Sequence, residues 1–128
     1  MKPVVIDASA SGAWVLPDEA NEAAHALYLQ AIEPTSDVNA PLYVPVLWHL
    51  EMGNMLVMAV KRDRLGAEHM AQALTLLGGL QLQTDAPLSA HRQAQVARLA
   101  LSHDLTFYDA TYLELVLRLN GQLASQDK

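Results

Sequence analysis

Short apolar segments alternate with longer helical segments along the whole chain, and this alternation restricts the possible folds most. The expected strands are Val4–Ile6, Leu42–Val44, Leu80–Thr84 and Gln122–Ser125. The expected helices are Asp18–Glu33, Val46 to about Arg64, Ala67 to about Leu77, Leu88 to about Ser102, and Asp109 to about Leu119. Strands that alternate with helices form a parallel sheet with helices on both faces. The sequence therefore predicts an α/β domain that binds its ligands at the carboxyl ends of the strands.

Length and composition restrict the class of protein further. The chain has 128 residues, 52% of them hydrophobic, so we expect a single domain over residues 1–128. It contains no cysteine, which excludes disulfides and thiolate metal sites and suits the cytoplasm. No secretory signal and no run of roughly 20 apolar residues is present, so we expect no membrane association. The net charge of −6 argues against binding nucleic acid through charge alone, unless some acids hold cations.

One acid, Asp7, directly follows the most apolar of the expected strands. The residues after it are all small, namely Ala8, Ser9, Ala10, Ser11 and Gly12. We interpret this run as space that lets a metal-bound phosphate approach the carboxylate. The alternative is that Asp7 caps a short helix, because aspartate is a preferred N-cap residue.

Three further acids stand where a solvated surface acid is not expected. Glu51 lies in mid-helix, on the face formed by Leu47, Trp48, Asn54 and Met55, where charge is costly without a partner. Asp109 begins a helix in an aromatic segment, and Asp127 follows the last strand. The alternatives are an arginine partner or a solvated helix edge for Glu51, an N-cap for Asp109, and an ordinary terminal acid for Asp127.

Together, Asp7, Glu51, Asp109 and Asp127 can converge at one edge of the sheet. Carboxylates that crowd together repel, so some of them must protonate or bind a cation. Donors that are all oxygen select hard cations, which here means Mg²⁺ or Mn²⁺. Two such ions can activate a water and stabilise the leaving oxygen in phosphodiester cleavage.

Four segments carry a resemblance to a known family. In chain order they are VIDAS (5–9), PVLWHLEMGNML (45–56), LTFYDATY (105–112) and LASQD (123–127). Their order and spacing resemble the PIN domain family, specifically the VapC-like toxins of toxin–antitoxin (VapBC) pairs. The resemblance implies a three-layer α/β/α sandwich with a central parallel sheet. It also implies an Mg²⁺- or Mn²⁺-dependent endoribonuclease that cleaves RNA.

The same resemblance assigns roles to individual residues and partners. It implies that Asp7, Glu51, Asp109 and Asp127 are catalytic, metal-binding acids, and that Ser9 is a hydroxyl that supports them. It further implies a homodimer and a VapB-like antitoxin that covers the site. The chain departs from the family pattern where Ser125 replaces a more usual threonine. It also ends at Lys128, whereas relatives usually continue through another helix and often a fifth strand.

Two other functions stay open. The first is a PIN scaffold with an incomplete site that acts by dimerisation or partner binding. The second is a phosphatase of the haloacid dehalogenase type, but that class resembles Asp-x-Asp where this chain has Asp7-Ala8-Ser9, and no catalytic lysine is evident.

Two groups of basic residues could contact RNA phosphates, namely Lys61, Arg62 and Arg64, and Arg92 and Arg98. Phosphate contacts from such side chains would position a nucleic acid on the surface. We favour the simpler interpretation that they compensate helix dipoles and promote solubility.

Overall fold

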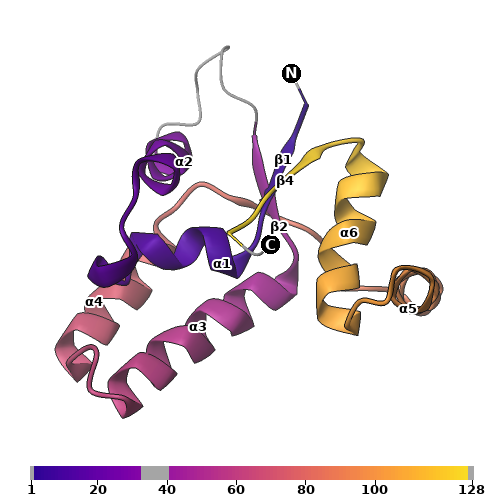
Figure 1. The fold of residues 1–128 in the computed structure, drawn as a ribbon. Helices are drawn as coiled ribbons and strands as arrows, with labels where there is room; N and C mark the ends of the chain where they lie inside the picture. The colour runs from indigo at the N-terminus through magenta and orange to yellow at the C-terminus, as the bar shows by residue number, and fades with distance from the viewer. Residues whose placement is uncertain (1, 33–40, 127–128) are drawn as a thin grey trace.

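A four-stranded parallel sheet forms the centre of the computed structural model, which describes residues 2–32 and 41–126 (Figure 1). The strands are β1 (Val4–Ile6), β2 (Leu42–Val44), β3 (Gln83–Thr84) and β4 (Gln122–Ala124), in the order β3-β2-β1-β4. All neighbours are parallel, and Val5 of β1 lies opposite Tyr43 on one side and Leu123 on the other. The parallel sheet expected from the sequence is confirmed.

Helices cover both faces of this sheet, as predicted (Figure 1). They are α1 (Ala8–Ser11), α2 (Glu22–Ile32), α3 (Val46–Lys61), α4 (Ala67–Gly78), α5 (Ala90–His103) and α6 (Phe107–Leu119), with 3₁₀ turns at Gly12–Trp14 and Pro17–Glu19. Helices α1 to α4 lie on one side of the sheet, and α6 with α5 outside it lies on the other (Figure 1). None of the helices in the described ranges has both the length and the apolar character that a membrane crossing needs.

The strand order explains this division of the helices and marks one edge of the sheet. The chain moves outward from β1 to β2 to β3 and then returns past β1 to form β4. Right-handed crossovers therefore place α5 and α6 on the face opposite to α1–α4. The reversal falls between β1 and β4, and the crevice beyond the carboxyl ends of such strands is where α/β sheets bind ligands. Asp7 follows β1 at this point.

The core lies mainly between the sheet and α3. Trp48, Met52 and Leu56 are spaced four residues apart, form one stripe along α3, and are at most 1% exposed. Val5 from the sheet and Leu115 from α6 belong to the same apolar cluster. Burial of this stripe holds α3 in place along most of its length. Glu51, which lies on α3, therefore has a fixed position.

Helix α2 begins later than predicted. The sequence predicted a helix from Asp18, but the segment Pro17–Glu19 forms a 3₁₀ turn and α2 begins at Glu22. The side chain of Asn21 supplies the cap, because its Oδ1 accepts a hydrogen bond from the amide of Ala24 at 2.9 Å. The predicted end of this helix at Glu33 lies outside the described residues.

The acids before α2 have a partner at the far end of α3. The guanidinium of Arg64 contacts Asp18 at 2.9 Å and Glu19 at 3.0 Å. Our interpretation of Arg64 as a residue that compensates a helix dipole is therefore incomplete, because its guanidinium is engaged by these two carboxylates. The contact connects the 3₁₀ turn to the end of α3.

Helix α6 begins earlier than predicted. It begins at Phe107, and the hydroxyl of Thr106 caps it by accepting a hydrogen bond from the amide of Asp109 at 3.0 Å. The alternative role of Asp109 as the N-cap is therefore wrong. The bounds of α3, α4 and α5 agree with the prediction to within three residues.

Strand β3 is shorter than the predicted Leu80–Thr84. Only Gln83 and Thr84 pair with β2, because the backbone before them is used elsewhere. The amide of Leu80 donates to the carbonyl of Leu77 at the end of α4, and the amide of Gln81 donates to Ala31 of α2. Alternation of apolar residues could not reveal these two contacts.

Candidate active site

Asp7 is held at the end of β1 by hydrogen bonds to one of its two carboxylate oxygens. Its Oδ1 accepts from the amide of Ala10 at 3.0 Å and from the hydroxyl of Ser9 at 2.7 Å. The first bond caps α1, so the capping alternative for Asp7 is confirmed. Within the described residues no hydrogen bond engages Oδ2. A carboxylate with one oxygen fixed and the other available can cap the helix and also bind a ligand.

Ser9 connects Asp7 to the end of β4. Its hydroxyl donates to Asp7 Oδ1 and accepts from the amide of Gln126 at 2.9 Å. It also lies 3.2 Å from the hydroxyl of Ser125. Ser9 thus contacts both the first acid of the chain and the end of β4. The sequence prediction placed Ser9 beside the acids, and the structure gives it direct contact with Asp7.

The small residues after Asp7 have a different use from the one we predicted. Ser11 is fully buried, and its hydroxyl donates to the Asp7 carbonyl at 2.6 Å and accepts from Trp48 Nε1 at 2.8 Å. A Cβ on Gly12 would lie 2.9 Å from the Sδ of Met55. These two residues are therefore small because α1 packs closely against α3. The interpretation of the whole run as clearance for a phosphate was wrong for Ser11 and Gly12.

Glu51 lies half-buried on α3, and its partner is a tyrosine rather than the arginine that we considered. The hydroxyl of Tyr112 on α6 donates to Glu51 Oε1 at 2.5 Å. Burial raises the pKa of Tyr112 most, followed by this hydrogen bond and by the negative charges of Glu51 and Asp7. The phenol therefore stays protonated and keeps donating to Glu51. Glu51 contacts Tyr112 directly, and the charge of Asp7 also acts on the same hydroxyl.

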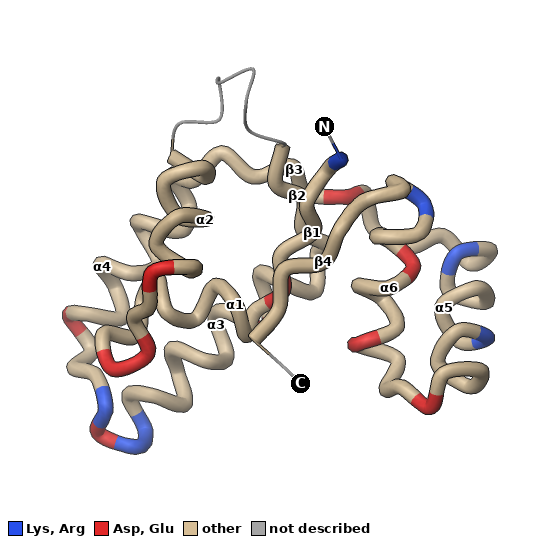
Figure 2. Tube along the Cα trace, turned by 45° about the horizontal axis from the view of Figure 1, so that its top comes forward, with Lys and Arg blue, Asp and Glu red and all other residues tan. Residues whose placement is uncertain are grey.

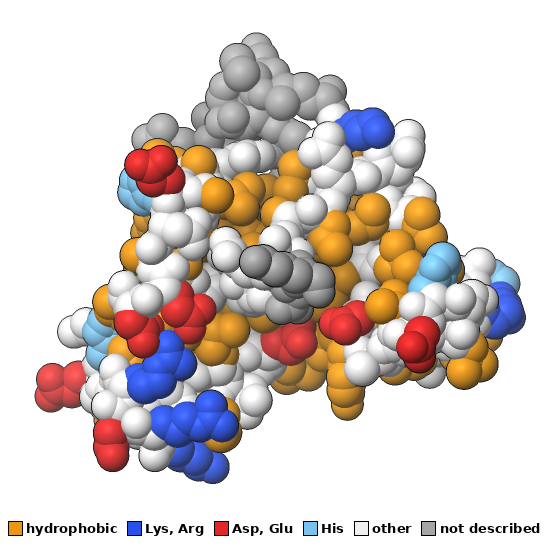
Figure 3. Space-filling model, viewed as in Figure 1, with side chains coloured by type: hydrophobic (Ala, Val, Ile, Leu, Met, Phe, Trp, Pro, Cys, Tyr) orange, Lys and Arg blue, Asp and Glu red, His pale blue; other side chains and the backbone are white. Residues whose placement is uncertain are grey.

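Asp109 is exposed in the first turn of α6. The helix dipole favours a carboxylate at this position. Asp109 stands three residues before Tyr112, and residues three apart lie on the same face of a helix. Figure 3 shows acidic side chains over the first half of α3 and over α6, near the middle of the face that Figure 1 also presents. Asp109 is thus an exposed acid one turn before the buried Tyr112 on α6.

The fourth predicted acid, Asp127, lies outside the described residues. Within residues 2–32 and 41–126, no group of three or more Asp, Glu, His or Cys side chains is close enough to hold a metal ion. The structure fixes Asp7 through Ser9 and Ala10, fixes Glu51 through Tyr112, and places Asp109 one turn before Tyr112 on α6. In donor chemistry these acids fit a hard cation, because all three are carboxylates and Asp7 has an unengaged oxygen.

Sequence reasoning missed Tyr112, which donates a hydrogen bond to Glu51. The residue was in view as the last letter of LTFYDATY, but we gave it no role. The available signal was its spacing of three from Asp109, which places both on one face of a helix. Its pairing with Glu51 spans 61 positions and has no local signal.

Fold and site together define a three-layer α/β domain with acids at the point where the strand order reverses. A family model described as the PIN domain matches residues 4–128. Ribonuclease VapC3 of Pyrobaculum aerophilum is 32% identical over 130 residues, which cover 98% of this chain and 89% of that protein. The chain therefore belongs to the PIN domain family.

Two solved structures share the fold. The crystal structure of PAE2754 from Pyrobaculum aerophilum matches with a TM-score of 0.65 at 23% identity, over 99% of this chain and 81% of that chain. The crystal structure of VapC20 from Mycobacterium tuberculosis, described as a sarcin-ricin loop cleaving toxin, matches with a TM-score of 0.60 at 16% identity. That match covers 97% of this chain and 89% of the VapC20 chain. At such identities the likeness supports the fold.

Proposed function

We propose that this protein is a metal-dependent endoribonuclease and the toxin of a toxin–antitoxin pair. The observation that carries the proposal is Asp7 at the carboxyl end of β1, where Ser9 and Ala10 fix its Oδ1 and no described residue forms a hydrogen bond with its Oδ2. Glu51, which is fixed by Tyr112 of α6, is the second acid of the proposed site. Membership of the PIN family and the similarity to a protein named ribonuclease VapC3 support it.

The residues that would hold Mg²⁺ or Mn²⁺ are Asp7, Glu51 and Asp109, with Asp127 as a fourth ligand. When bound, the ion would supply positive charge to the scissile phosphate and to the attacking water. The protein itself contributes fixed ligands. Ser9 and the amide of Ala10 orient Asp7, so that its Oδ2 is the oxygen available to an ion.

Tyr112 and Asp109, both on α6, complete the proposed metal site. Tyr112 orients Glu51 through its hydroxyl, and its position on α6 connects Glu51 of α3 to the helix that carries Asp109. Asp109 is exposed, so an RNA backbone can approach from its side. Acids that are held rigidly and can be reached from solvent suit the cleavage of a bond within a long RNA chain. A small substrate would instead suit an enclosed site.

We also propose a homodimer, a VapB-like antitoxin as partner, and a cytoplasmic location. Exposed apolar side chains support the need for a partner. Leu101 is 87% exposed, Leu50 is 68% exposed and Leu117 is 58% exposed. Apolar groups of this size are often covered by another protein when they form a patch.

The test is cleavage of a structured RNA by the purified protein with Mg²⁺ or Mn²⁺. We expect the substitution Asp7→Asn to lower the rate by roughly 10²–10³-fold, the range typical for removing one electrostatic group from a site. EDTA should abolish the wild-type activity. Circular dichroism of Asp7→Asn controls for folding, because asparagine can still cap α1. Equal cleavage by wild type and Asp7→Asn would contradict the proposal.

One observation favours a second candidate function, a PIN scaffold that binds partners without cleaving RNA. It is the absence of a third metal-ligating side chain near Asp7 and Glu51 within the part of the chain that the structure describes. Calorimetric titration with Mn²⁺ separates the two functions. Binding that is lost in Asp7→Asn supports the nuclease, and absence of binding by the wild type supports the scaffold.

A further inference from the structure

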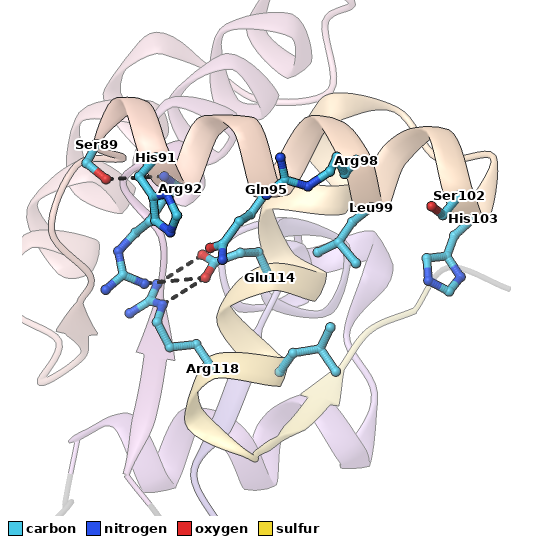
Figure 4. A pocket seen from close by; sticks show the side chains of 11 residues that line it. Ser89, His91, Arg92, Gln95, Arg98, Leu99, Ser102, His103, Glu114 and Arg118 are labelled. Atoms are coloured by element: carbon cyan, nitrogen blue, oxygen red, sulfur yellow. Dashed lines mark hydrogen bonds and ion pairs between the residues drawn. The ribbon is translucent and has the colours of Figure 1, made fainter.

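A groove with a volume of about 810 Å³ lies between α5 and α6 and has no role in the candidate active site. Helix α6 lies between α5 and the sheet (Figure 1). Figure 4 shows its lining, in which Arg92, Gln95 and Glu114 point toward one another at one end and His103 lies at the other. Arg98 and Arg118 also line it. We call this feature the α5–α6 groove.

The charge of the α5–α6 groove is opposite to that of the whole chain, whose net charge is −6. Among its described lining residues, Glu114 is the only acid, and it is 5% exposed. Glu114 accepts from Arg118 Nε at 2.8 Å and more weakly from Arg92 Nη1 at 3.5 Å. The hydrogen bonds of Arg118 to Glu114, and then to Asp85, raise its pKa, so that it stays positive. The charge of Glu114 is thus already balanced, and the lining side chains keep a net positive charge.

Arg98 is the clearest part of that surplus. It is exposed, and no described residue forms an ion pair or hydrogen bond with its side chain. Arg64 differs, because Asp18 and Glu19 occupy its guanidinium. Figure 2 shows the basic positions of α5 on the opposite side of the molecule from those at the end of α3. The α5–α6 groove therefore carries one arginine, Arg98, that has no partner among the described residues, beside Arg92, whose contact with Glu114 is long.

The shape of this surface suits a chain of phosphates rather than one small anion. The lining residues of α5 run from His91 to His103, which at 1.5 Å per residue is a row about 18 Å long. Cationic side chains alternate along it with the neutral donors Gln95 and Ser102. Arginine side chains with polar neighbours are the usual contacts of phosphate backbones. The row ends at His103, which is followed within six residues by Asp109 of the candidate active site.

We propose that the α5–α6 groove binds the backbone phosphates of the RNA strand, away from the bond that is cleaved. The inference rests on the proposed function, because that function supplies the RNA. Arg98 and Arg92 contact phosphates, Gln95 and Ser102 donate hydrogen bonds, and Arg118 with Glu114 fixes the wall of the groove. The groove thereby positions the strand relative to Asp109.

The test compares Arg98→Gln with Arg62→Gln, a matched loss of one exposed arginine at the other end of the molecule. Full-length protein is titrated with a fluorescein-labelled single-stranded RNA of 20 nucleotides in EDTA, so that no cleavage occurs, at several KCl concentrations. Loss of one phosphate contact should flatten the slope of log K against log[KCl] by about 0.7 in Arg98→Gln. The slope of Arg62→Gln should equal that of the wild type.

Equal slopes for Arg98→Gln and Arg62→Gln would overturn the inference. So would displacement of the RNA by polyglutamate of equal charge as effectively as by unlabelled RNA, because the groove would then suit an acidic protein segment. Cleavage measured in parallel separates the two proposals. If the wild type cleaves RNA but the binding slopes are equal, the proposed role of the groove is wrong and the nuclease proposal stands. If Arg98→Gln changes the slope selectively but the wild type does not cleave RNA, the groove binds RNA and the nuclease proposal is wrong.

Discussion

The helices on the two faces of the sheet are held in contrasting ways. Helix α3 buries Trp48, Met52, Leu56 and Ala59 against the sheet, whereas α5 buries only Val96 among its described residues. Helix α5 contacts mainly α6, which stands between it and the sheet (Figure 1). Apolar burial fixes the first region, and charged contacts such as those of Glu114 with Arg92 and Arg118 organise the second. The region that carries Glu51 is thus built for rigidity, and the region around α5 presents polar groups to a ligand.

The substitution Trp48→Ala should have the largest effect on stability. The indole is 1% exposed and donates to Ser11, so its removal leaves a cavity and a buried hydroxyl without its donor. We expect the free energy of unfolding to fall by about 3–5 kcal/mol, measured by urea denaturation. Leu101→Ala on α5 is the control, and it should change stability by no more than about 0.5 kcal/mol. A similar loss in both variants would remove the contrast between the two regions.

Loss of a guanidinium should matter more in the second region than at the end of α3. Arg118→Ala leaves the nearly buried Glu114 with only its long contact to Arg92, and should cost about 1–3 kcal/mol. Arg64→Ala removes exposed contacts and should cost about 0–1 kcal/mol. Urea denaturation of both variants measures the difference. Equal costs would show that the charged contacts around Glu114 do not organise that region.

Tyr112→Phe should have a small effect on stability and a clear effect on activity. The variant removes one hydrogen bond to Glu51, for an expected loss of about 1 kcal/mol. Loss of a group that orients a metal ligand typically costs 10–100-fold, so we expect RNA cleavage to fall by roughly that factor. RNA binding in EDTA should not change, because the α5–α6 groove lies on another side of α6. A change in binding with unaltered cleavage would contradict the separate roles of the two faces of this helix.

Much of the fold could be predicted because it depends on local patterns. The apolar run of β1 and the four-residue spacing in α3 specify a strand and a buried helix without further information. The start of α6 could also have been predicted, because Thr106 is a good N-cap residue. We considered only Asp109 for that role, as an alternative. The length of β3 was not within reach, since the amides of Leu80 and Gln81 are used by other elements.

The candidate site divides in the same way. Asp7 was evident because an acid at the end of a buried strand is unusual, and Glu51 because its helix face is otherwise apolar. The contact of Tyr112 with Glu51 was not evident, because it joins residues 61 positions apart in the sequence. The same holds for the contact of Arg118 with Asp85, 33 positions away. Side-chain partners across a fold follow from packing, which local patterns do not specify.

The contact of Ser9 with Gln126 has a consequence for the order of events during synthesis. Asp7 and Ser9 are synthesised early, but the amide that donates to the hydroxyl of Ser9 belongs to Gln126, 117 positions later. The amide of Asp7 likewise donates to the carbonyl of Ala124 in β4. Closing so long a loop comes late in folding. In a growing chain, the surroundings of Asp7 therefore stay incomplete until β4 pairs with β1.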